Sequence, residues 1–364
     1  MDEFELVIEV EYRINNLFRR IESCEVTSMN RENVISGRRV DLDVNLLRKG
    51  RSYRVLVEIK SAGSPRILRN AAAQLKSLRK SIPNESDVYL MLAAPYISDD
   101  GMAICKEEGV GCFDLAGNCY LSFDSLYVEI RGNKNPLPST RSIKSLFSPK
   151  SSRITRVLLS DVRKWWKVQE LAKEAKVSLG LVSVIKQRLL DEELITAEKT
   201  FPSTILETKK SVQVKSPKRL LDMWTDNYSF RKNRIQEYYS LDNGTDIEER
   251  MQAYCDGQSI RCALGLFSGA SRSAPFIRFN KSFMYVDAKL DAVAAANGLK
   301  PVPSGANVAL LMPYDESVFY RSREIDGLKV VSDIQLYVDL KTYKGRGDEA
   351  AEFLFENKIK PQWQ

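Results

Sequence analysis

Apolar and polar positions alternate along residues 38–61, RRVDLDVNLLRKGRSYRVLVEIKS, on both sides of Lys49–Gly50. A period of two predicts a pair of β-strands, and a central Lys-Gly suits a two-residue hairpin turn. Apolar residues recur at helical spacing in residues 3–21 and 65–82, whereas residues 87–97, DVYLMLAAPYI, form the continuous apolar run of a buried strand. The pattern predicts a mixed α/β sheet covered by helices.

The hairpin turn determines which side chains face each other. Counting back from a two-residue turn pairs Arg48 with Arg51 and Asp41 with Glu58. Residues two apart on a strand project from the same side, so Lys60 joins Glu58. We therefore expect Asp41, Glu58 and Lys60 to share one face of the hairpin.

Two carboxylates directly across a hairpin repel each other unless a cation lies between them. Oxygen ligands favour Mg²⁺, with Mn²⁺ as the alternative, and Asp41 and Glu58 are the predicted ligands. Lys60 would position an attacking water or neutralise charge on a phosphate. Asp43 competes with Asp41 because it has the same parity and would face Leu56, but we prefer Asp41. A solvated acidic face is the ordinary alternative.

The spacing of Asp41 and Glu58-x-Lys60 resembles that of the PD-(D/E)xK nuclease superfamily, over roughly the first 130 residues. The resemblance implies a restriction-endonuclease-like mixed sheet with a helix first, and a helix carrying a glutamine after the hairpin. Gln74 is that glutamine, which we place with the catalytic residues. The first helix offers a further carboxylate ligand from Glu5, Glu9 or Glu11, of which we choose Glu11. The fold could also persist with its activity lost, the domain only holding nucleic acid.

Composition removes several alternatives. The chain has no histidine, which excludes Ser-His-Asp and Cys-His catalysis and histidine-ligated zinc. Its six cysteines contain no C-x-x-C pair and are expected as reduced, mostly buried thiols. No uninterrupted apolar run approaches the roughly 20 residues of a membrane span. We expect a cytoplasmic protein of two or three domains.

Basic charge is concentrated in the middle of the chain. Residues 1–130 hold 17 Lys and Arg against 20 Asp and Glu, residues 131–240 hold 23 against 11, and residues 241–364 hold 15 against 17. Residues 133–152 are basic and rich in Pro, Ser and Asn, which predicts a linker. Such an excess is typical of a surface that meets a polyanion, although a solvated linker is the alternative.

The basic region continues into a helix-turn-helix pattern. We predict helices at 154–166, 168–176 and 178–194, the last capped by Ser178, with Val182, Ile185 and Leu189 packed inward. The pattern resembles a winged helix-turn-helix, whose third helix enters the major groove of double-stranded DNA. The residues left on its outer face and early turns are Ser178, Leu179, Gly180, Ser183, Lys186 and Gln187. A two-stranded wing after it would place lysines on phosphates, namely Lys199, Lys209, Lys210 and Lys215.

The last third reads as a further α/β region. An amphipathic helix at 217–230 is followed by candidate strands at 283–287, 308–314 and 328–340 and a closing helix at 346–359. The small residues of RCALGLFSGA predict a closely packed helix. The acidic residues of this region are expected to be ordinary surface or capping residues, namely Asp315, Glu316, Asp333, Asp339 and Glu349.

Segments such as VSLGLVSVIKQRLLDEELI, RCALGLFSGASRSAPF and QLYVDLKTYKGRGDEAAEFL are similar to the AbiEi family antitoxins of type IV toxin-antitoxin systems, from about residue 105 onward. In DLAGN, which matches the family, we assign Asp114 and Asn118 a turn role. The resemblance implies a DNA-binding regulator of its own promoter that opposes a nucleotidyltransferase toxin, without necessarily binding it.

These patterns divide the chain into a nuclease-like domain (1–132), a basic linker (133–152), a winged helix-turn-helix (153–215) and an antitoxin-like α/β domain (216–364). Two functions remain. The protein is either an antitoxin-like transcriptional regulator whose front domain holds DNA or forms a homodimer, or a Mg²⁺-dependent DNA endonuclease directed by its winged helix, with a role in phage defence.

Overall fold

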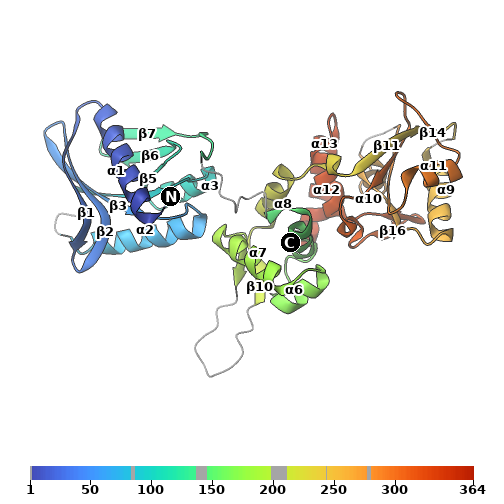
Figure 1. The fold of residues 1–364 in the computed structure, drawn as a ribbon, viewed down its shortest axis with the longest axis horizontal. Helices are drawn as coiled ribbons and strands as arrows, with labels where there is room; N and C mark the ends of the chain where they lie inside the picture. The colour runs from blue at the N-terminus through green and yellow to red at the C-terminus, as the bar shows by residue number, and fades with distance from the viewer. Residues whose placement is uncertain (1, 83–86, 137–145, 198–210, 243, 277–279) are drawn as a thin grey trace, which may run out of the picture. The chain divides into compact units, whose positions relative to one another are not determined.

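The computed structural model describes residues 2–82, 87–136, 146–197, 211–242, 244–276 and 280–364 (Figure 1). The chain forms two compact units, residues 1–142 with 190–193, and residues 143–189 with 194–364. Helices and strands alternate in both units, and the described strands form three sheets. The predicted multidomain mixed α/β fold is thus confirmed at this level.

A seven-stranded sheet in the order β1-β2-β3-β4-β5-β6-β7 organises the first unit. The strands β3, β4 and β5 are parallel and the remaining neighbours are antiparallel. The elements are α1 (Glu3–Arg20), β1 (Cys24–Ile35), β2 (Arg38–Arg48), β3 (Arg51–Ile59), α2 (Pro65–Arg79), β4 (Val88–Ala94), α3 (Asp99–Glu107), β5 (Gly111–Asp114), β6 (Cys119–Phe123) and β7 (Leu126–Ile130).

The predicted hairpin has the expected register. Arg48 pairs with Arg51, and the ladder continues to Leu42 and Val57. The turn is Lys49–Gly50, with φ of 48° and 78°, in the left-handed region that glycine adopts without strain. The adjacent long strand β1 was not predicted, because its residues are mostly half-exposed or exposed and show little apolar alternation.

Each face of the first sheet has its own apolar core. The apolar side of α1, including Val10, Ile14 and Phe18, packs on one face with Val44 and Val55. The other face is covered by α2 and α3, whose buried residues meet alternate residues of β3 and β4. Strand β4 is buried along its whole length, as its continuous apolar run predicted.

The second unit begins with the segment for which a winged helix-turn-helix was predicted. Its elements are α5 (Pro149–Ser160), β8 (Trp166–Lys167), α6 (Val168–Glu174), α7 (Leu179–Asp191), β9 (Ile195–Ala197) and β10 (Ser211–Val214). The first helix starts inside the segment expected to be linker, because Pro149 suits a first helical turn. It ends at Ser160 rather than 166, because Trp166 and Lys167 pair with β10 instead.

The C-terminal part of this unit contains a seven-stranded mixed sheet, in the order β14-β11-β15-β13-β12-β17-β16. Its strands are β11 (Arg234–Tyr239), β12 (Cys262–Leu264), β13 (Ser282–Val286), β14 (Lys300–Pro301), β15 (Val308–Met312), β16 (Arg323–Ile325) and β17 (Leu328–Val330). Its helices are α8 (Pro217–Asp226), α9 (Gly244–Gly257), α10 (Leu266–Ser273), α11 (Leu290–Ala296), α12 (Asp333–Lys341), α13 (Gly347–Leu354) and α14 (Lys360–Trp363), with single helical turns at Phe230–Lys232 and Glu316–Phe319 and a π turn at Phe355–Ile359.

One predicted strand of this region is wrong. Residues 328–340 form the short strand β17 and then the helix α12, which is capped by Ser332 through the backbone N–H of Gln335. Residues 333–340 are buried on all sides, so their sequence shows no polar face from which a helical period could be recognised.

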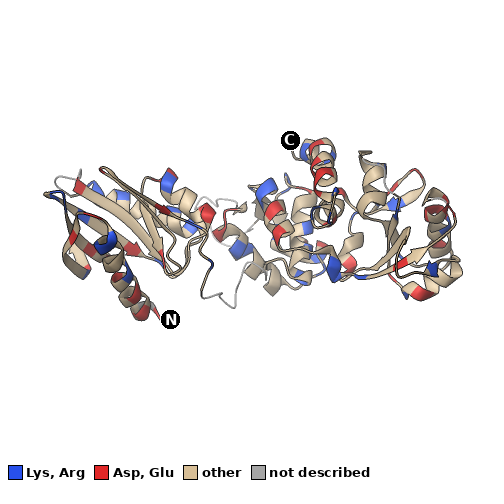
Figure 2. Cartoon of the chain, turned by 90° about the horizontal axis from the view of Figure 1, so that it is seen from above, with Lys and Arg blue, Asp and Glu red and all other residues tan. Residues whose placement is uncertain are grey.

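Other features agree with the expectations. The small-residue segment forms β12 and the closely packed helix α10, where Gly269 lies against Leu264 and Leu336. All six cysteines are free, and five of them are buried. Among the described helices, none combines the length and apolar character needed to cross a membrane. Basic and acidic side chains are interspersed along the helices of both units (Figure 2).

Candidate nucleic-acid interface and carboxylate site

Helix α7 has the two faces that a recognition helix needs. Ser178 precedes it, and its hydroxyl accepts a hydrogen bond from the N–H of Leu181 at 3.2 Å. Val182, Ile185 and Leu189 are at most 1% exposed and anchor the helix to the core of the unit, as predicted. The helix is therefore held by one face and presents the other.

The presented face contains the residues selected from the sequence. Ser178, Leu179, Gly180, Ser183 and Gln187 are exposed. Lys186 is half-buried and has interactions of its own. A side chain at Gly180 would meet open space, so the backbone there can approach a ligand closely. Val184, 51% exposed, also lies on this surface and was not predicted, since an apolar residue gave no sign of being solvent-facing.

The wing is present as a small sheet. β10 pairs with β9 on one side and with β8 on the other, both antiparallel. Lys199, Lys209 and Lys210 lie outside the described residues. Lys215 follows β10, and its N–H bonds to the carbonyl of Leu194 at 2.9 Å, next to the end of α7. The small sheet thus stands beside the end of α7, the arrangement that a winged helix would have.

Asp41, Glu58 and Lys60 meet where the β2–β3 ladder ends. The last ladder pair is Leu42 with Val57, one step before Asp41 and Glu58. The Asp41 carboxylate accepts the N–H of Ile59 at 2.6 Å, in place of a ladder carbonyl. The Lys60 ammonium donates to Glu58 Oε1 at 2.6 Å. The hairpin therefore holds an ammonium and one carboxylate in contact, with a second carboxylate beside them.

The electrostatics of this group suit a divalent cation. Burial raises the pKa of Glu58, the nearby Asp41 charge raises it further, and the hydrogen bond from Lys60 opposes both. Two repelling, half-buried oxygen donors fit Mg²⁺ or Mn²⁺, which prefer carboxylate ligands and would remove the repulsion. The Glu58 side chain is only 17% exposed, so Lys60 supplies the partial neutralisation that burial demands.

Asp43, the alternative first ligand, is already fully engaged. It is 2% exposed and accepts two hydrogen bonds from Arg54, at 2.7 and 2.9 Å, and one from Asn33 at 2.5 Å. The Arg54 and Asn33 contacts lower its pKa in spite of burial. Asp43 forms a structural ion pair with Arg54, which leaves Asp41 as the candidate first metal ligand.

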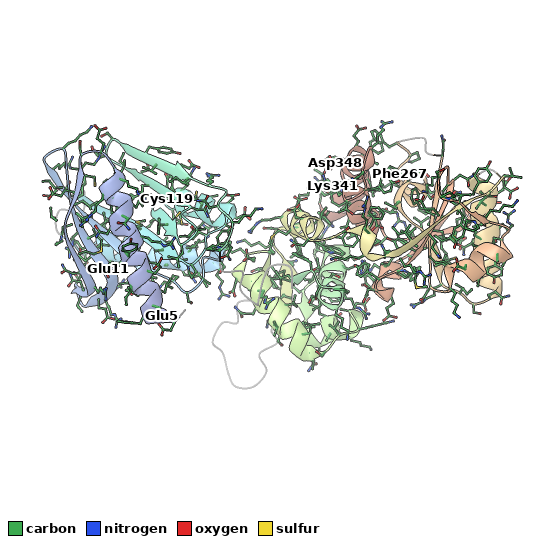
Figure 3. The ribbon with its side chains drawn as sticks, turned by 45° about the horizontal axis from the view of Figure 1, so that its top comes forward. Glu5, Glu11, Cys119, Phe267, Lys341 and Asp348 are labelled. Atoms are coloured by element: carbon green, nitrogen blue, oxygen red, sulfur yellow. The ribbon has the colours of Figure 1, made fainter. Side chains whose placement is uncertain are left out.

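Glu11 does not join the carboxylates. It lies on α1 (Figure 3) and pairs with Arg31 of β1. Within the part of the chain that the structure describes, no group of three acidic, cysteine or histidine residues is arranged to hold a metal. The expected three-carboxylate ligand set is therefore wrong for Glu11, because α1 packs on a sheet face where β1 supplies a partner. Glu5 instead forms a capping box with Asp2, and Glu9 pairs with Arg13.

Gln74 is exposed on α2. Among the described residues, it forms no hydrogen bond with Asp41, Glu58 or Lys60. Its catalytic role stays a prediction. The turn role of Asp114 and Asn118 is confirmed: Asp114 is fully buried and accepts the Asn118 N–H at 2.8 Å and the Ile97 N–H at 3.0 Å.

Two buried charged residues escaped sequence reasoning. Asp339, expected at the surface, is fully buried in α12, and Arg156 of α5 is fully buried beside it in the same unit. The Arg156 guanidinium donates to Gln335 Oε1, and Gln335 Nε2 donates to Asp339 Oδ1 at 2.9 Å. Single charged residues in amphipathic helices are usually exposed, so nothing in the sequence marks this network.

Comparisons with known proteins bear on the C-terminal part. No curated protein matches the chain. A crystal structure of a repair endonuclease from Pyrococcus abyssi matches with 19% identity and a TM-score of 0.25, over 32% of this chain and 47% of that chain, so less than half of the endonuclease is spanned. Residues 213–360 match the family described as transcriptional regulator, AbiEi antitoxin, type IV toxin-antitoxin system. The C-terminal part of the chain is therefore similar to AbiEi-type antitoxins and transcriptional regulators.

Proposed function

We propose that this protein is a DNA-binding transcriptional regulator of antitoxin type, which recognises its operator through α7. The observation that carries the proposal is the exposed face of α7 beside a wing, directly ahead of the AbiEi-type domain. Gly180 in the first turn, with Ser183 and Gln187 behind it, is small or polar enough to reach base edges, and Leu179 offers an apolar contact for a thymine methyl. The basic excess of residues 131–240 supports binding to phosphates.

Operator binding is testable by gel shift with the DNA upstream of the protein's own gene. Gln187→Ala should weaken binding to the specific site by about tenfold, since one good base contact contributes about 1–3 kcal/mol, and leave non-specific binding unchanged. Gln258→Ala, at an exposed glutamine that follows α9 in the same unit, is the matched control. Equal affinity of wild type and Gln187→Ala for the specific site would refute the assignment of α7.

The antitoxin part of the proposal concerns a nucleotidyltransferase toxin. Such regulators need not bind the toxin, so the decisive readout is growth rather than complex formation. A toxin gene adjacent to this one should arrest growth when expressed alone, and co-expression of this chain should restore it. A Gln187→Ala chain that fails to repress but still restores growth would separate the two activities.

A second candidate function is Mg²⁺-dependent DNA cleavage, favoured by the contact of Lys60 with Glu58 beside Asp41. Asp41 and Glu58 would hold the ion, which when bound supplies Lewis-acid polarisation of a phosphate. Lys60 would then turn from Glu58 toward the attacking water or the phosphate, and hold it by its ammonium. Gln74, exposed on α2, would contact the substrate.

Plasmid nicking tests this candidate. Wild-type protein with Mg²⁺ or Mn²⁺ should convert supercoiled plasmid to open circles, and Lys60→Ala should abolish the conversion. Lys80→Ala, an exposed lysine after α2 in the same unit, should cleave as wild type does. Wild-type protein that leaves the plasmid intact with either ion eliminates the enzyme and leaves the regulator standing.

A further inference from the structure

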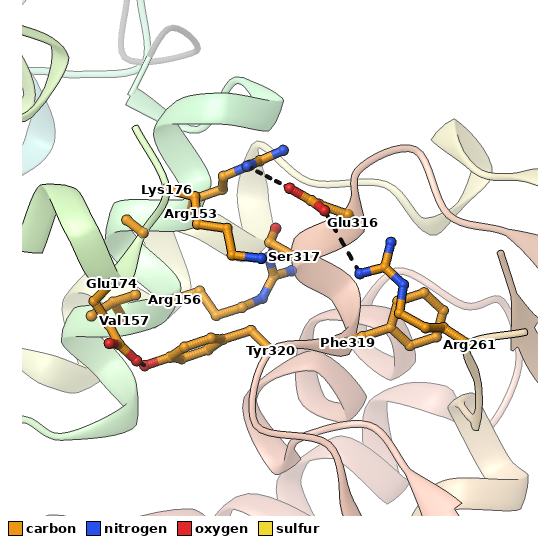
Figure 4. A pocket seen from close by; sticks show the side chains of 11 residues that line it. Arg153, Arg156, Val157, Glu174, Lys176, Arg261, Glu316, Ser317, Phe319 and Tyr320 are labelled. Carbon is orange, nitrogen blue, oxygen red and sulfur yellow. Dashed lines mark hydrogen bonds and ion pairs between the residues drawn. The ribbon is translucent and has the colours of Figure 1, made fainter. Parts of the chain in front are cut away.

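A cavity of about 210 Å³ lies between the helix-turn-helix and the AbiEi-type domain, both within the second unit (Figure 4). One wall comes from α5 and the end of α6, with Arg156, Glu174 and Lys176. The opposite wall comes from the helical turn Glu316–Phe319, with Ser317 and Phe319, and from Tyr320 just after it. Two hydrogen bonds join the walls: Tyr320 donates to Glu174 at 2.8 Å, and Arg156 donates to Ser317.

The positive charges around this cavity are unequally compensated. Arg153 is paired with Asp315 at 2.8 Å and with Glu316 at 3.1 Å. Arg261 lies 3.6 Å from the same Glu316 and also pairs with Asp287. The charges of Arg153 and Arg261 are therefore neutralised by carboxylates of the protein itself.

Arg156 and Lys176 differ from them. Among the described residues, neither has a carboxylate at ion-pair distance, and Lys176 is exposed at the rim. The fully buried Arg156 donates only to the neutral oxygens of Ser317 and Gln335, lies 5.1 Å from the Trp224 ring, and leaves its Nε without a partner. Gln335, which accepts from Arg156, also donates to the buried Asp339, so this carboxylate is near Arg156 but not in contact with it. A buried guanidinium with no carboxylate in contact is costly, so an anion in the cavity would stabilise this arrangement.

The aromatic residues in the wall and the cavity volume limit which chemical group can be attached to the anion. Phe319 and Tyr320 are half-buried and offer aromatic carbon to a flat group. The volume is too small for a duplex, which could lay only a backbone phosphate on the rim. We propose that this cavity binds a small organic phosphate of the mononucleotide class, with the phosphate at Lys176 in the field of Arg156 and the base against Phe319 and Tyr320.

Such a ligand would act on DNA binding through the turn it touches. Lys176 lies two residues before Ser178, the cap of α7, and Arg156 lies on the first helix of the same motif. Occupancy would fix the α6–α7 turn against the AbiEi-type domain and shift operator affinity by about fivefold or more, the lower range of ordinary coupling between sites. The proposal has two halves: that the cavity binds the ligand (the binding half), and that the bound ligand changes operator affinity (the regulatory half). The regulatory half rests on the proposed function, whereas the binding half does not.

Calorimetric titration of the full-length protein with AMP, GMP, CMP and UMP tests the binding half. We expect saturable binding of at least one of them, and a loss of roughly tenfold in Lys176→Ala, as for a hydrogen bond to a charged group. Phe319→Ala should also weaken binding, and Lys173→Ala, on α6 but not among the residues that line the cavity, should not. The exposed Lys176 is the primary site of substitution because Arg156→Gln removes a buried side chain and can prevent folding.

The outcomes separate the alternatives. Absence of binding by every mononucleotide, or equal binding by wild type and Lys176→Ala, overturns the site. Inorganic phosphate or ribose 5-phosphate binding as tightly as the mononucleotides overturns the base contact, and displacement of the nucleotide by random-sequence duplex overturns the small-ligand assignment. Gel shifts with and without the nucleotide test the regulatory half, which unchanged operator affinity would overturn. A protein that binds nucleotide but not operator DNA would contradict the proposed function alone.

Discussion

The buried carboxyl group of Asp339 should make the second unit more stable to unfolding at acidic pH than at neutral pH. Its carboxylate is fully buried and accepts hydrogen bonds from Tyr228 at 2.6 Å, Tyr285 at 2.8 Å and Gln335 at 2.9 Å. Burial outweighs these donors and the Arg156 charge, and raises the pKa of Asp339 from 3.8 to about 6. The folded protein therefore binds this proton more tightly than the unfolded chain does.

The sign and size of the effect follow from linkage. Below about pH 4 the carboxyl is protonated in both states and its burial costs least. As pH rises through the window from 3.8 to about 6, the unfolded chain loses the proton first, so the free energy of unfolding falls. A shift of about two pKa units at ~1.4 kcal/mol each amounts to about 3 kcal/mol, all of it lost by neutral pH.

The isosteric Asp339→Asn variant isolates this contribution, because every other titrating group is shared with wild type. All four tryptophans, Trp165, Trp166, Trp224 and Trp363, belong to the second unit, so their fluorescence during urea unfolding reports on that unit. The difference in free energy of unfolding, variant minus wild type, should increase by about 3 kcal/mol from about pH 4 to about pH 7. A difference that stays constant across this range would refute the assignment.

Three further substitutions test the packing and the carboxylate site. Gly269→Ala should lower the free energy of unfolding of the second unit by about 1–3 kcal/mol, seen as a lower urea midpoint, because its Cβ would lie 2.9 Å from the immobile carbonyl oxygen of Leu264; an unchanged midpoint would contradict this. Arg54→Leu should lower the free energy of unfolding of the first unit by about 3 kcal/mol, because it leaves the buried Asp43 carboxylate without its cation. Backbone amides of β2 and β3 should then exchange hydrogen faster. Exchange at the wild-type rate would show that the hydrogen bond from Asn33 alone is enough to stabilise the Asp43 carboxylate. Mn²⁺ binding, measured by titration calorimetry, should weaken on acidification as Glu58, whose pKa is raised, takes up a proton, and in Glu58→Gln it should be weak at every pH; strong binding by that variant would exclude Glu58 as a ligand.

Local patterns anticipated the elements whose two faces differ. The hairpin register followed from a two-residue turn and strict alternation, and the inward residues of α7 followed from helical spacing. The same reasoning failed for residues 333–340, which are buried all round and have no polar face. It also missed β1, whose exposure hides any period.

The sequence by itself determined the register of the hairpin from Arg48–Arg51 as far as Leu42–Val57, next to Asp41 and Glu58, because a turn of defined length sets the pairing of the residues that follow it. It equally determined which side of α7 meets solvent. Only the tertiary structure decided that Glu11 pairs with Arg31, that Asp43 is neutralised by Arg54, and that Arg156 is buried with neutral oxygens as its hydrogen-bond partners. These outcomes depend on contacts between elements that are distant in the chain, and a pattern with a period of two or 3.6 residues contains no information about such partners.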